Sequence, residues 1–474
     1  MPRYPDEQLI HASACEIREL LLKKEISAHD LLDALENRIA LVDNKVNALP
    51  TLCFERARTT VNELEKKPVT ERGILGGIPV AIKDLTAVKG VRTTYGSPIF
   101  ADEIPDHSDV LVETMEKNGA VIYAKSNTPE FGAGAHTFNP VFGTTCNPWD
   151  LTKSAAGSSG GAAAALASGT AWLAHGSDMG GSLRNPASFC GVVGLRPSLH
   201  LVASGPSPTP FQTLSMQGPM ARNVEDTALL LDAMVGSHPT SPLALDAPGE
   251  RFLATSRKKT PPKKIAFSPD LGVSPVDPEI LDICKTAALH FQEAGVIVEE
   301  SCPDLSEAPE VFRRLRGLDF LVGLGPLQEE HPGKLKEDII LNIEYGRNLS
   351  AEDIAWAERK RGEIYHRMQS FFGEYDLLLC PATIVPPFPI EQRYVSECAG
   401  QKFESYIDWL ALVSSITITA SPALSLPCGF TSAGLPVGLQ LVGRPRADAE
   451  LLSAANLLEE ILPKTPTPIL PKTF

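Results

Sequence analysis

The spacing of apolar residues at the start of the chain predicts two amphipathic helices. Leucine and isoleucine recur three, four and seven positions apart over residues 7–24 and again over 28–42, which lines one face of a helix. Ser27 stands directly before the second segment. Its hydroxyl can accept a hydrogen bond from an early helical N–H group and so mark where that helix begins.

Strand-like and helix-like patterns alternate along the rest of the chain. Residues 78–82 and 121–124 are short apolar runs typical of buried strands, and residues 110–118 between them have helical spacing. The same criteria predict elements in the C-terminal half: a helix and then a strand over 273–298, a charged helix over 351–372, and strands over 377–380, 420–427 and 435–442. This alternation favours an α/β protein with a parallel or mixed sheet that helices cover.

Small residues dominate residues 150–200, which are dense in glycine, serine and alanine. Within this block the longest apolar stretch, 160–176, includes two hydroxyl residues and a histidine. A buried helix that packs closely through small residues explains these interruptions better than a membrane span does. Residues 203–216 are rich in proline, serine and threonine and are expected to form an irregular loop.

The overall charge excludes one class of partner. The chain has 43 basic and 58 acidic residues and a net charge of −15. A non-specific nucleic-acid binder needs a basic surface to displace counterions. We therefore expect no nucleic-acid partner, and a monomer or a homo-oligomer.

Cysteine usage and the first residues indicate the compartment. The nine cysteines are scattered without a C-x-x-C pair, so neither a disulfide framework nor a zinc site is expected. Reduced thiols are typical of cytoplasmic proteins. The first residues lack the apolar run of a signal peptide. The expectation is a cytoplasmic protein that does not enter a membrane.

The first residue that points to chemistry is Lys83, which directly follows the apolar run 78–82. Lysine is rarely fully buried. Burial disfavours its charged form, lowers its pKa and can turn the amine into a general base. Two ordinary alternatives stay open: the side chain can extend from the strand end to the surface, or it can pair with the neighbouring Asp84.

Two glycine-rich clusters follow further along the chain. Residues 157–161, Gly-Ser-Ser-Gly-Gly, lack the lysine of a phosphate-binding loop. They match the G-x-S-x-G nucleophile elbow with Ser159 at its centre, but the C-terminal strands lack the histidine that this fold's triad needs. In residues 176–182, two glycines directly precede Ser182, which lets consecutive backbone N–H groups turn inward as an oxyanion hole. A flexible loop and a tight turn are the plain alternatives.

In combination, the lysine after a strand, the Ser-Ser among glycines and the Gly-Gly-Ser turn resemble the amidase signature family. The resemblance covers most of the chain, and its motifs are residues 77–84, 93–97, 143–144, 147–149, 157–161, 178–184, 190–197 and 435–440. One departure is Ala156, where the family usually has glycine; it leaves the catalytic atoms intact. The implied fold is one α/β/α domain over residues 1–474. In it, a core block at 75–200 and a C-terminal part at 265–474 share a mixed central sheet covered by helices on both faces.

The resemblance also implies a role for each motif residue. Ser182 would be the nucleophile, Lys83 the base, and Ser158 the relay between them, with a cis peptide bond before Ser158. Three backbone N–H groups would form the oxyanion hole, those of Met179, Gly180 and Gly181. Asp178 and Arg184 flank that turn and are expected to pair and brace it. The implied reaction is hydrolysis of a small-molecule carboxylic amide through an acyl-enzyme on Ser182, with no metal and no cofactor.

The substrate pocket is less defined by the sequence. Residues 203–216 and 311–346 depart most from the motif blocks, so we expect them to shape the pocket and its specificity. Phe138, Phe211 and Met216 are candidate substrate-binding residues, although a position in the core would suit each of them equally well.

Three alternatives compete with a stand-alone amidase. As the resemblance aligns it, the A-type subunit of a glutamyl-tRNA amidotransferase would need an arginine near Leu341 or Asn342 and an aspartate near Leu410, and neither charge is present. A non-catalytic binding protein on the same scaffold would not need the intact Lys-Ser-Ser set. A membrane-bound fatty-acid amide hydrolase would need an N-terminal anchor, which we do not find, or a strong apolar cap.

Overall fold

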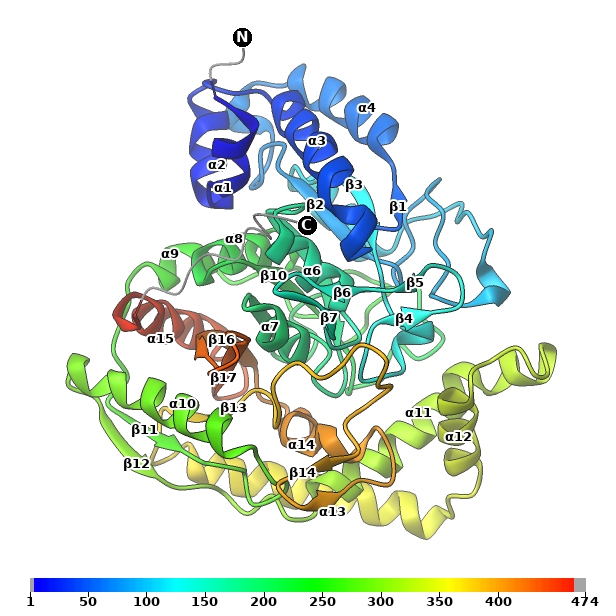
Figure 1. Ribbon diagram of the computed structural model, residues 1–474, viewed down its shortest axis with the longest axis vertical. Helices are drawn as coiled ribbons and strands as arrows, with labels where there is room; N and C mark the ends of the chain where they lie inside the picture. The colour runs from blue at the N-terminus through cyan, green and yellow to red at the C-terminus, as the bar shows by residue number, and fades with distance from the viewer. Residues whose placement is uncertain (1–3, 464–474) are drawn as a thin grey trace.

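One large sheet organises the molecule. The computed structural model describes residues 4–463. Within them, eleven strands form a sheet in the order β1-β3-β2-β8-β10-β9-β16-β17-β13-β11-β12, and helices cover both of its faces (Figure 1). The α/β fold expected from the alternating pattern is confirmed.

Strand directions change across this sheet, so the sheet is mixed. Strand β2 is parallel to β3 and β8, and β11 is parallel to β12 and β13, whereas the strands between these groups are antiparallel. In their order across the sheet, the strands are β1 (Thr51–Leu52), β3 (Val121–Ser126), β2 (Pro79–Lys83), β8 (Leu173–Asp178), β10 (Met216–Ala221), β9 (Val193–Arg196), β16 (Ala423–Phe430), β17 (Pro436–Val442), β13 (Leu377–Pro381), β11 (Lys264–Phe267) and β12 (Ile297–Glu300).

The helices and three small hairpins complete the described chain. The helices are α1 (Asp6–His11), α2 (Ala14–Leu22), α3 (Ala28–Val46), α4 (Phe54–Glu65), α5 (Val110–Lys117), α6 (Gly160–Ser168), α7 (Arg184–Cys190), α8 (Val224–Met234), α9 (Phe252–Ser256), α10 (Pro278–Leu289), α11 (Ala308–Glu330), α12 (Glu337–Arg347), α13 (Ala351–Phe371), α14 (Ala411–Ile418) and α15 (Asp448–Ile461). The paired short strands are β4 (Phe138–Asn139) with β5 (Gly143–Thr144), β6 (Cys146–Asn147) with β7 (Asp150–Ser154), and β14 (Glu397–Cys398) with β15 (Gln401–Lys402).

The pairing of β2 with β8 brings distant parts of the sequence together. Ala81 lies opposite Ala174 in parallel register, so the carboxyl ends of both strands meet at one edge of the sheet. There β2 ends on Lys83 and β8 ends on Asp178. Helix α6 packs against both strands, and the residues just before it reach the same edge. In α/β sheets, ligands bind at such carboxyl ends.

Helices α11 and α12 form a hairpin that projects from one side of the molecule, at the right of Figure 1. They approach very closely, because a Cβ atom on Gly346 would lie 2.1 Å from the Gly317 carbonyl oxygen. A small apolar cluster lies between the two helices and the segment that contains Ala133; its buried side chains are those of Ala133, Phe320, Leu335, Ile339 and Ile343. Met179 packs against this cluster, so the hairpin lies next to the glycine turn that follows β8.

Two predicted helices are shorter than the sequence pattern indicated. The helix expected over 7–24 is two helices, because the Ser13 hydroxyl accepts a bond from the Glu16 N–H at 3.1 Å and the Glu16 carboxylate accepts one from the Ser13 N–H at 2.7 Å. This capping box starts a new helix. The helix expected over 160–176 stops after its first half, where Gly169 has φ +74°, and strand β8 takes the rest.

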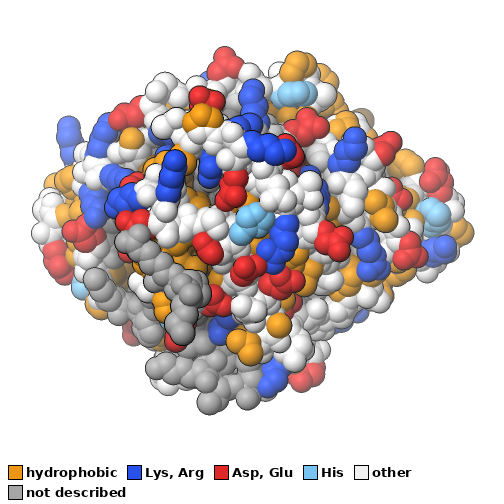
Figure 2. Space-filling view, turned by 90° about the horizontal axis from the view of Figure 1, so that it is seen from above, with side chains coloured by type: hydrophobic (Ala, Val, Ile, Leu, Met, Phe, Trp, Pro, Cys, Tyr) orange, Lys and Arg blue, Asp and Glu red, His pale blue; other side chains and the backbone are white. Residues whose placement is uncertain are grey.

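The charges on the molecular surface are mixed. On the face shown in Figure 2, basic and acidic side chains are interspersed. Within residues 4–463, none of the helices combines the length and apolar character that a membrane crossing requires. Over the same residues, no three His, Cys, Asp or Glu side chains converge as metal ligands. All nine cysteines are free thiols.

Candidate active site

Lys83, the last residue of β2, lies at the centre of a group of serine hydroxyls. Its side chain is fully buried. Three hydroxyls surround its Nζ, those of Ser158 at 2.7 Å, Ser159 at 2.9 Å and Ser177 at 3.1 Å. We call these four residues the lysine–serine cluster. The alternative that Lys83 pairs with Asp84 is wrong, because that carboxylate binds Lys125 at 3.2 Å.

Burial sets the charge of the Lys83 amine. Desolvation lowers its pKa to about 7, against the opposing effect of the nearby Asp178 carboxylate. A neutral amine has two N–H donors and one lone pair. The donors match Ser159 and Ser177, which leaves the lone pair for the hydroxyl hydrogen of Ser158. The cluster is therefore suited to hold a base at neutral pH.

Ser158 and Ser159 lie in the short segment between β7 and α6. The peptide bond between Gly157 and Ser158 is cis. Ser158 is 2% exposed and Ser159 is fully buried. The Ser159 N–H donates to the Ser182 carbonyl oxygen at 3.1 Å, so a backbone bond ties the two serine-containing segments together.

Ser182 differs from the buried serines in its accessibility. It is partly exposed, and its hydroxyl makes no hydrogen bond with any residue between 4 and 463. The Ser158 hydroxyl contacts Lys83 but is not hydrogen-bonded to Ser182. Catalytic hydrogen bonds are often long before substrate binds and tighten in the complex. Ser182 thus presents a free hydroxyl in a segment that is hydrogen-bonded through its backbone to the segment of Ser158 and Ser159.

The residues before Ser182 form a turn that only small residues fit. Gly181 has φ +101°, and a Cβ atom there would lie 2.4 Å from the Val413 side chain. A Cβ atom on Gly180 would lie 2.8 Å from the ring of Phe312. Real Cβ atoms do not approach so closely. Glycine is therefore required at position 181 for the backbone conformation and the packing, and at position 180 for the packing.

One of the three N–H groups predicted to form the oxyanion hole is already engaged. The Gly181 N–H donates to the Asp178 carboxylate at 2.9 Å. The N–H groups of Met179 and Gly180 donate to no side chain and to no turn carbonyl within the described residues. These two are therefore the donors that face no competitor for a developing oxyanion.

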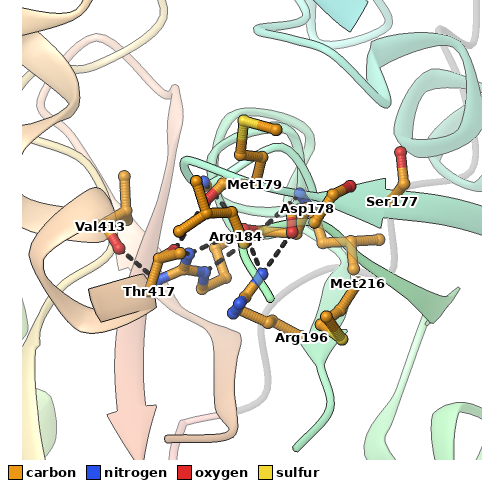
Figure 3. Close-up of polar contacts among 12 residues, drawn as sticks. Ser177, Asp178, Met179, Arg184, Arg196, Met216, Val413 and Thr417 are labelled. Atoms are coloured by element: carbon orange, nitrogen blue, oxygen red, sulfur yellow. Dashed lines mark hydrogen bonds and ion pairs between the residues drawn. The ribbon is translucent and has the colours of Figure 1, made fainter. Parts of the chain in front are cut away.

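Asp178 is held between two arginines (Figure 3). Arg184 reaches its two carboxylate oxygens at 2.8 and 3.0 Å, and Arg196 lies 3.6 Å away. Burial by itself would raise the pKa of the Asp178 carboxyl, but the two guanidinium groups hold it well below its usual range. The predicted pairing of Asp178 with Arg184 is confirmed.

Arg184 also connects the turn to the C-terminal half of the chain. It donates to the Val413 carbonyl oxygen at 2.9 Å and to the Gln440 side chain at 2.6 Å. The Thr417 hydroxyl donates to the Met179 carbonyl oxygen at 2.7 Å. Helix α14 and strand β17 therefore brace the glycine turn from behind.

Comparison with known proteins identifies the family of the chain. The sequence profile of the amidase family matches residues 30–452. The chain belongs to the amidase family. It is 34% identical to an acylamidase of Rhodococcus erythropolis, over 96% of this chain and 97% of that protein. It is also 34% identical to the A-type subunit of a glutamyl-tRNA(Gln) amidotransferase of Moorella thermoacetica, with the same coverage.

Solved structures show the same likeness for this amidase. A bacterial aryl acylamidase of the amidase signature family superimposes with a TM-score of 0.88 at 27% identity, covering 95% of this chain and 96% of that one. A 6-aminohexanoate cyclic dimer hydrolase in complex with substrate superimposes with a TM-score of 0.86 at 26% identity, covering 96% and 98%.

The three predicted substrate-binding residues of the amidase lie in different places. Phe211 is 69% exposed and lines a cavity with α11 and α13. Met216 is buried at the start of β10, where its sulfur accepts a hydrogen bond from the His200 N–H at 3.2 Å. Phe138 is partly buried, with the Lys336 ammonium 5.7 Å from its ring. Met216 also lies opposite Asp178 in the antiparallel pairing of β10 with β8, so its backbone is next to the site. Within residues 4–463, no side-chain hydrogen bond or ring contact joins any of the three to the lysine–serine cluster.

Sequence reasoning did not predict two polar residues of the site. Ser177 directly precedes Asp178, so its place beside the glycine turn was a usable signal. Arg316 lies in α11, with its Nη1 3.1 Å from the Met179 sulfur. It falls in the region 311–346 that we expected to shape the pocket, but no local pattern distinguishes it from other helical arginines.

Proposed function

We propose that this enzyme hydrolyses carboxylic amides to an acid and an amine or ammonia through an acyl-enzyme on Ser182. One contrast carries the proposal. A buried amine with a pKa of about 7 lies 2.7 Å from the Ser158 hydroxyl, whereas the neighbouring Ser182 hydroxyl is unbonded and partly exposed. Serine becomes an effective nucleophile only when a base removes its proton during attack.

Acylation would proceed by proton transfer through Ser158. Ser182 Oγ attacks the amide carbon while its proton passes to Ser158, whose own proton passes to the Lys83 lone pair. The carbonyl oxygen becomes an oxyanion and accepts hydrogen bonds from the N–H groups of Met179 and Gly180. The Gly181 N–H can join them only by sharing its hydrogen bond with Asp178.

Breakdown of the tetrahedral intermediate would use the same relay in reverse. The charged Lys83 returns its proton through Ser158 to the leaving nitrogen, so that a neutral amine departs. Water then attacks the ester of Ser182, and its proton passes through Ser158 to Lys83. Lys83 returns that proton through Ser158 to Ser182 Oγ as the acid is released, which restores the free enzyme. Every proton in this cycle is held by a group of this chain.

The named relatives support amide cleavage as the reaction type. One is named an acylamidase, and two of the superimposed structures are named an aryl acylamidase and a 6-aminohexanoate cyclic dimer hydrolase. These names fit an enzyme that acts on an unactivated C–N bond. Aryl amides are practical first substrates because the released arylamine is easily measured.

Replacement of Ser182 tests the proposal. Ser182→Ala should lower the turnover of an acyl 4-nitroanilide by about 10⁴-fold or more, while the far-UV circular dichroism and the melting temperature stay close to those of the wild type. A fluorophosphonate should label the wild type on Ser182, which peptide mass spectrometry would locate.

Ser159→Ala is the matched control, because Ser159 also lies in the lysine–serine cluster but is fully buried. It should reduce turnover yet retain fluorophosphonate labelling of Ser182. An active Ser182→Ala protein together with an inactive Ser159→Ala protein would replace this mechanism by the nucleophile-elbow alternative.

The relative from Moorella thermoacetica favours a second candidate, a glutamine-cleaving protein that passes ammonia to partner proteins. Against it, the positions where the resemblance places the glutamine-binding charges hold neutral residues, and Leu341 is 60% exposed. Co-purification with partner proteins, and turnover of glutamine that depends on ATP and tRNA, would favour this candidate over a stand-alone amidase.

A further inference from the structure

Arg316 is a buried cation without a counterion beside the glycine turn. It lies in α11 and is 5% exposed, and no carboxylate oxygen of residues 4–463 lies within 4.0 Å of its guanidinium nitrogens. Its neighbours in the helix are different. Arg313 is paired with Asp408, and Arg314 is paired with Glu310 at 2.7 Å.

Neutral groups use only part of the hydrogen-bonding capacity of Arg316. A guanidinium has five N–H donors. Nε donates to the Asn342 side chain at 3.2 Å, Nη2 donates to the Tyr406 hydroxyl, and Nη1 donates to the Met179 sulfur at 3.1 Å. A thioether is a weak acceptor. The weakest of the three acceptors, the Met179 sulfur, therefore lies on the side of the glycine turn. Two of the five N–H groups of Arg316 have no acceptor among residues 4–463.

Aromatic rings and one distant carboxyl offset the charge only in part. The guanidinium carbon lies 4.2 Å from the centre of the Phe320 ring and 5.6 Å from that of Tyr406. Burial raises the pKa of the Asp319 carboxyl, and the charge of Arg316 opposes this shift, but the two groups form no ion pair. A buried charge is unfavourable without a partner. An anion from outside the chain would therefore compensate the charge of Arg316.

The position of Arg316 connects it to the reacting atoms. Met179 is partly exposed and is the first residue of the turn whose N–H groups face the oxyanion. Phe312, one helical turn before Arg316, is the residue that a Cβ on Gly180 would strike. Helix α11 therefore lies across the turn. On the other side of the guanidinium, Asn342 and Tyr406 line a cavity of about 340 Å³.

We propose that Arg316 binds a carboxylate of the substrate, so that the preferred amides carry a carboxylate a few atoms from the scissile bond. This inference rests on the proposed amide hydrolysis. A carboxylate would take the two free N–H donors and displace the thioether sulfur. The planar fork of a guanidinium matches a carboxylate in a bidentate geometry, which a lysine cannot reproduce.

Two matched pairs of substrates test the inference, one for each side of the amide. The acyl pair is the 4-nitroanilides of succinic acid and butanoic acid. The amine pair is N-acetyl-4-aminobenzoate and N-acetyl-4-toluidine. Arg316→Met should lower kcat/KM for the carboxylated member of at least one pair by about 10- to 100-fold, mainly through KM, and leave its neutral member nearly unchanged.

Controls separate binding from a structural role of the arginine. Arg313→Met removes an arginine from the same helix. It should not lower kcat/KM selectively for the carboxylated member of either pair. If Arg316→Met does not fold, Arg316→Lys keeps the charge without the fork and should still reduce the preference for the carboxylated substrate. Equal losses on charged and neutral members, or no loss on either, would overturn the inference.

A failure of the proposed hydrolysis would give different results from a failure of the Arg316 inference. In that case the wild type would turn over no member of either pair, or turnover would survive Ser182→Ala. Calorimetric binding of succinamate and of butanamide to the Ser182→Ala protein then tests Arg316 without turnover. Tighter binding of succinamate that Arg316→Met removes would support the inference, and equal binding of the two would overturn it.

Discussion

Lys83 can accept a proton only as the neutral amine, so the charge of this one side chain governs the proposed chemistry. Burial lowers its pKa to about 7. Below that pH the protonated fraction grows and the base is lost. We predict that kcat/KM for an uncharged amide rises about tenfold per pH unit below this pKa and levels off above it. A profile that is flat from about pH 6 to 8 would place the base elsewhere.

The same residue has a second task that can be separated from the first. As an acid it protonates the leaving nitrogen, which departs poorly as an anion, whereas a phenolate leaves readily without a proton. Lys83→Ala should lose about 10²–10⁴-fold in acylation by an ester and still more for an amide of the same acyl group. Acylation rates for the matched pair measure this. Equal fractional losses would show that the proton reaches the amine by another path.

At the scale of elements, the site depends on how a few segments end. Strands β2 and β8 run in parallel and stop at one edge of the sheet, which places Lys83 beside the glycine turn. Helix α6 starts there with the two serines before its first residue. Because each segment contributes one or two groups, a shift of any one of them would separate the base from the relay.

The connection through Arg184 gives a prediction at this scale. Arg184→Met would leave the buried Asp178 carboxylate with only the more distant Arg196. Removing one partner of a buried ion pair costs about 3–5 kcal/mol, so urea denaturation should show a loss of this size in the free energy of unfolding. Turnover should fall as well, because the glycine turn loses its support. Arg314→Met removes two partly exposed ion pairs, with Glu310 and Asp353, and should cost about 1 kcal/mol or less. Equal costs for the two variants would contradict the bracing role.

At the scale of the whole molecule, the buried amine makes stability depend on pH. The folded-state pKa of Lys83 is about 7, below its ordinary value of 10.5. Below the folded pKa both states carry the proton and the cost of burial is complete. Between the two values only the unfolded chain keeps the proton, so stability rises with pH.

Lys83→Met removes this titration and so isolates it. The variant should be more stable than the wild type near neutral pH by an amount on the order of a few kcal/mol, and the difference should shrink as pH approaches 10. Urea unfolding of both proteins at about pH 7 and pH 10 measures it. A difference that does not change with pH would mean that the folded protein does not hold Lys83 as a neutral amine.

The sequence by itself determined the local features, because these depend on neighbouring residues. Apolar runs predicted strands β2, β3 and β17, and Ser27 predicted the start of α3. The Gly-Gly-Ser turn marked Ser182 as a candidate nucleophile, the family resemblance implied Ser158 as the relay, and Asp178 with Arg184 were expected to pair. The break of the first predicted helix was also encoded locally, in the Ser13–Glu16 capping box, and was missed because the apolar spacing continues through it.

Only the tertiary structure decided which distant groups meet. The order of strands in the sheet puts Lys83 within hydrogen-bonding distance of serines 75 to 94 positions away and pairs Asp84 with Lys125 instead. Packing of α11 across the turn brings Arg316 to Met179, and the loop around Phe211 turns that side chain outward. The physical reason is that burial and long-range contacts follow from how elements pack, and no short stretch of sequence contains both partners.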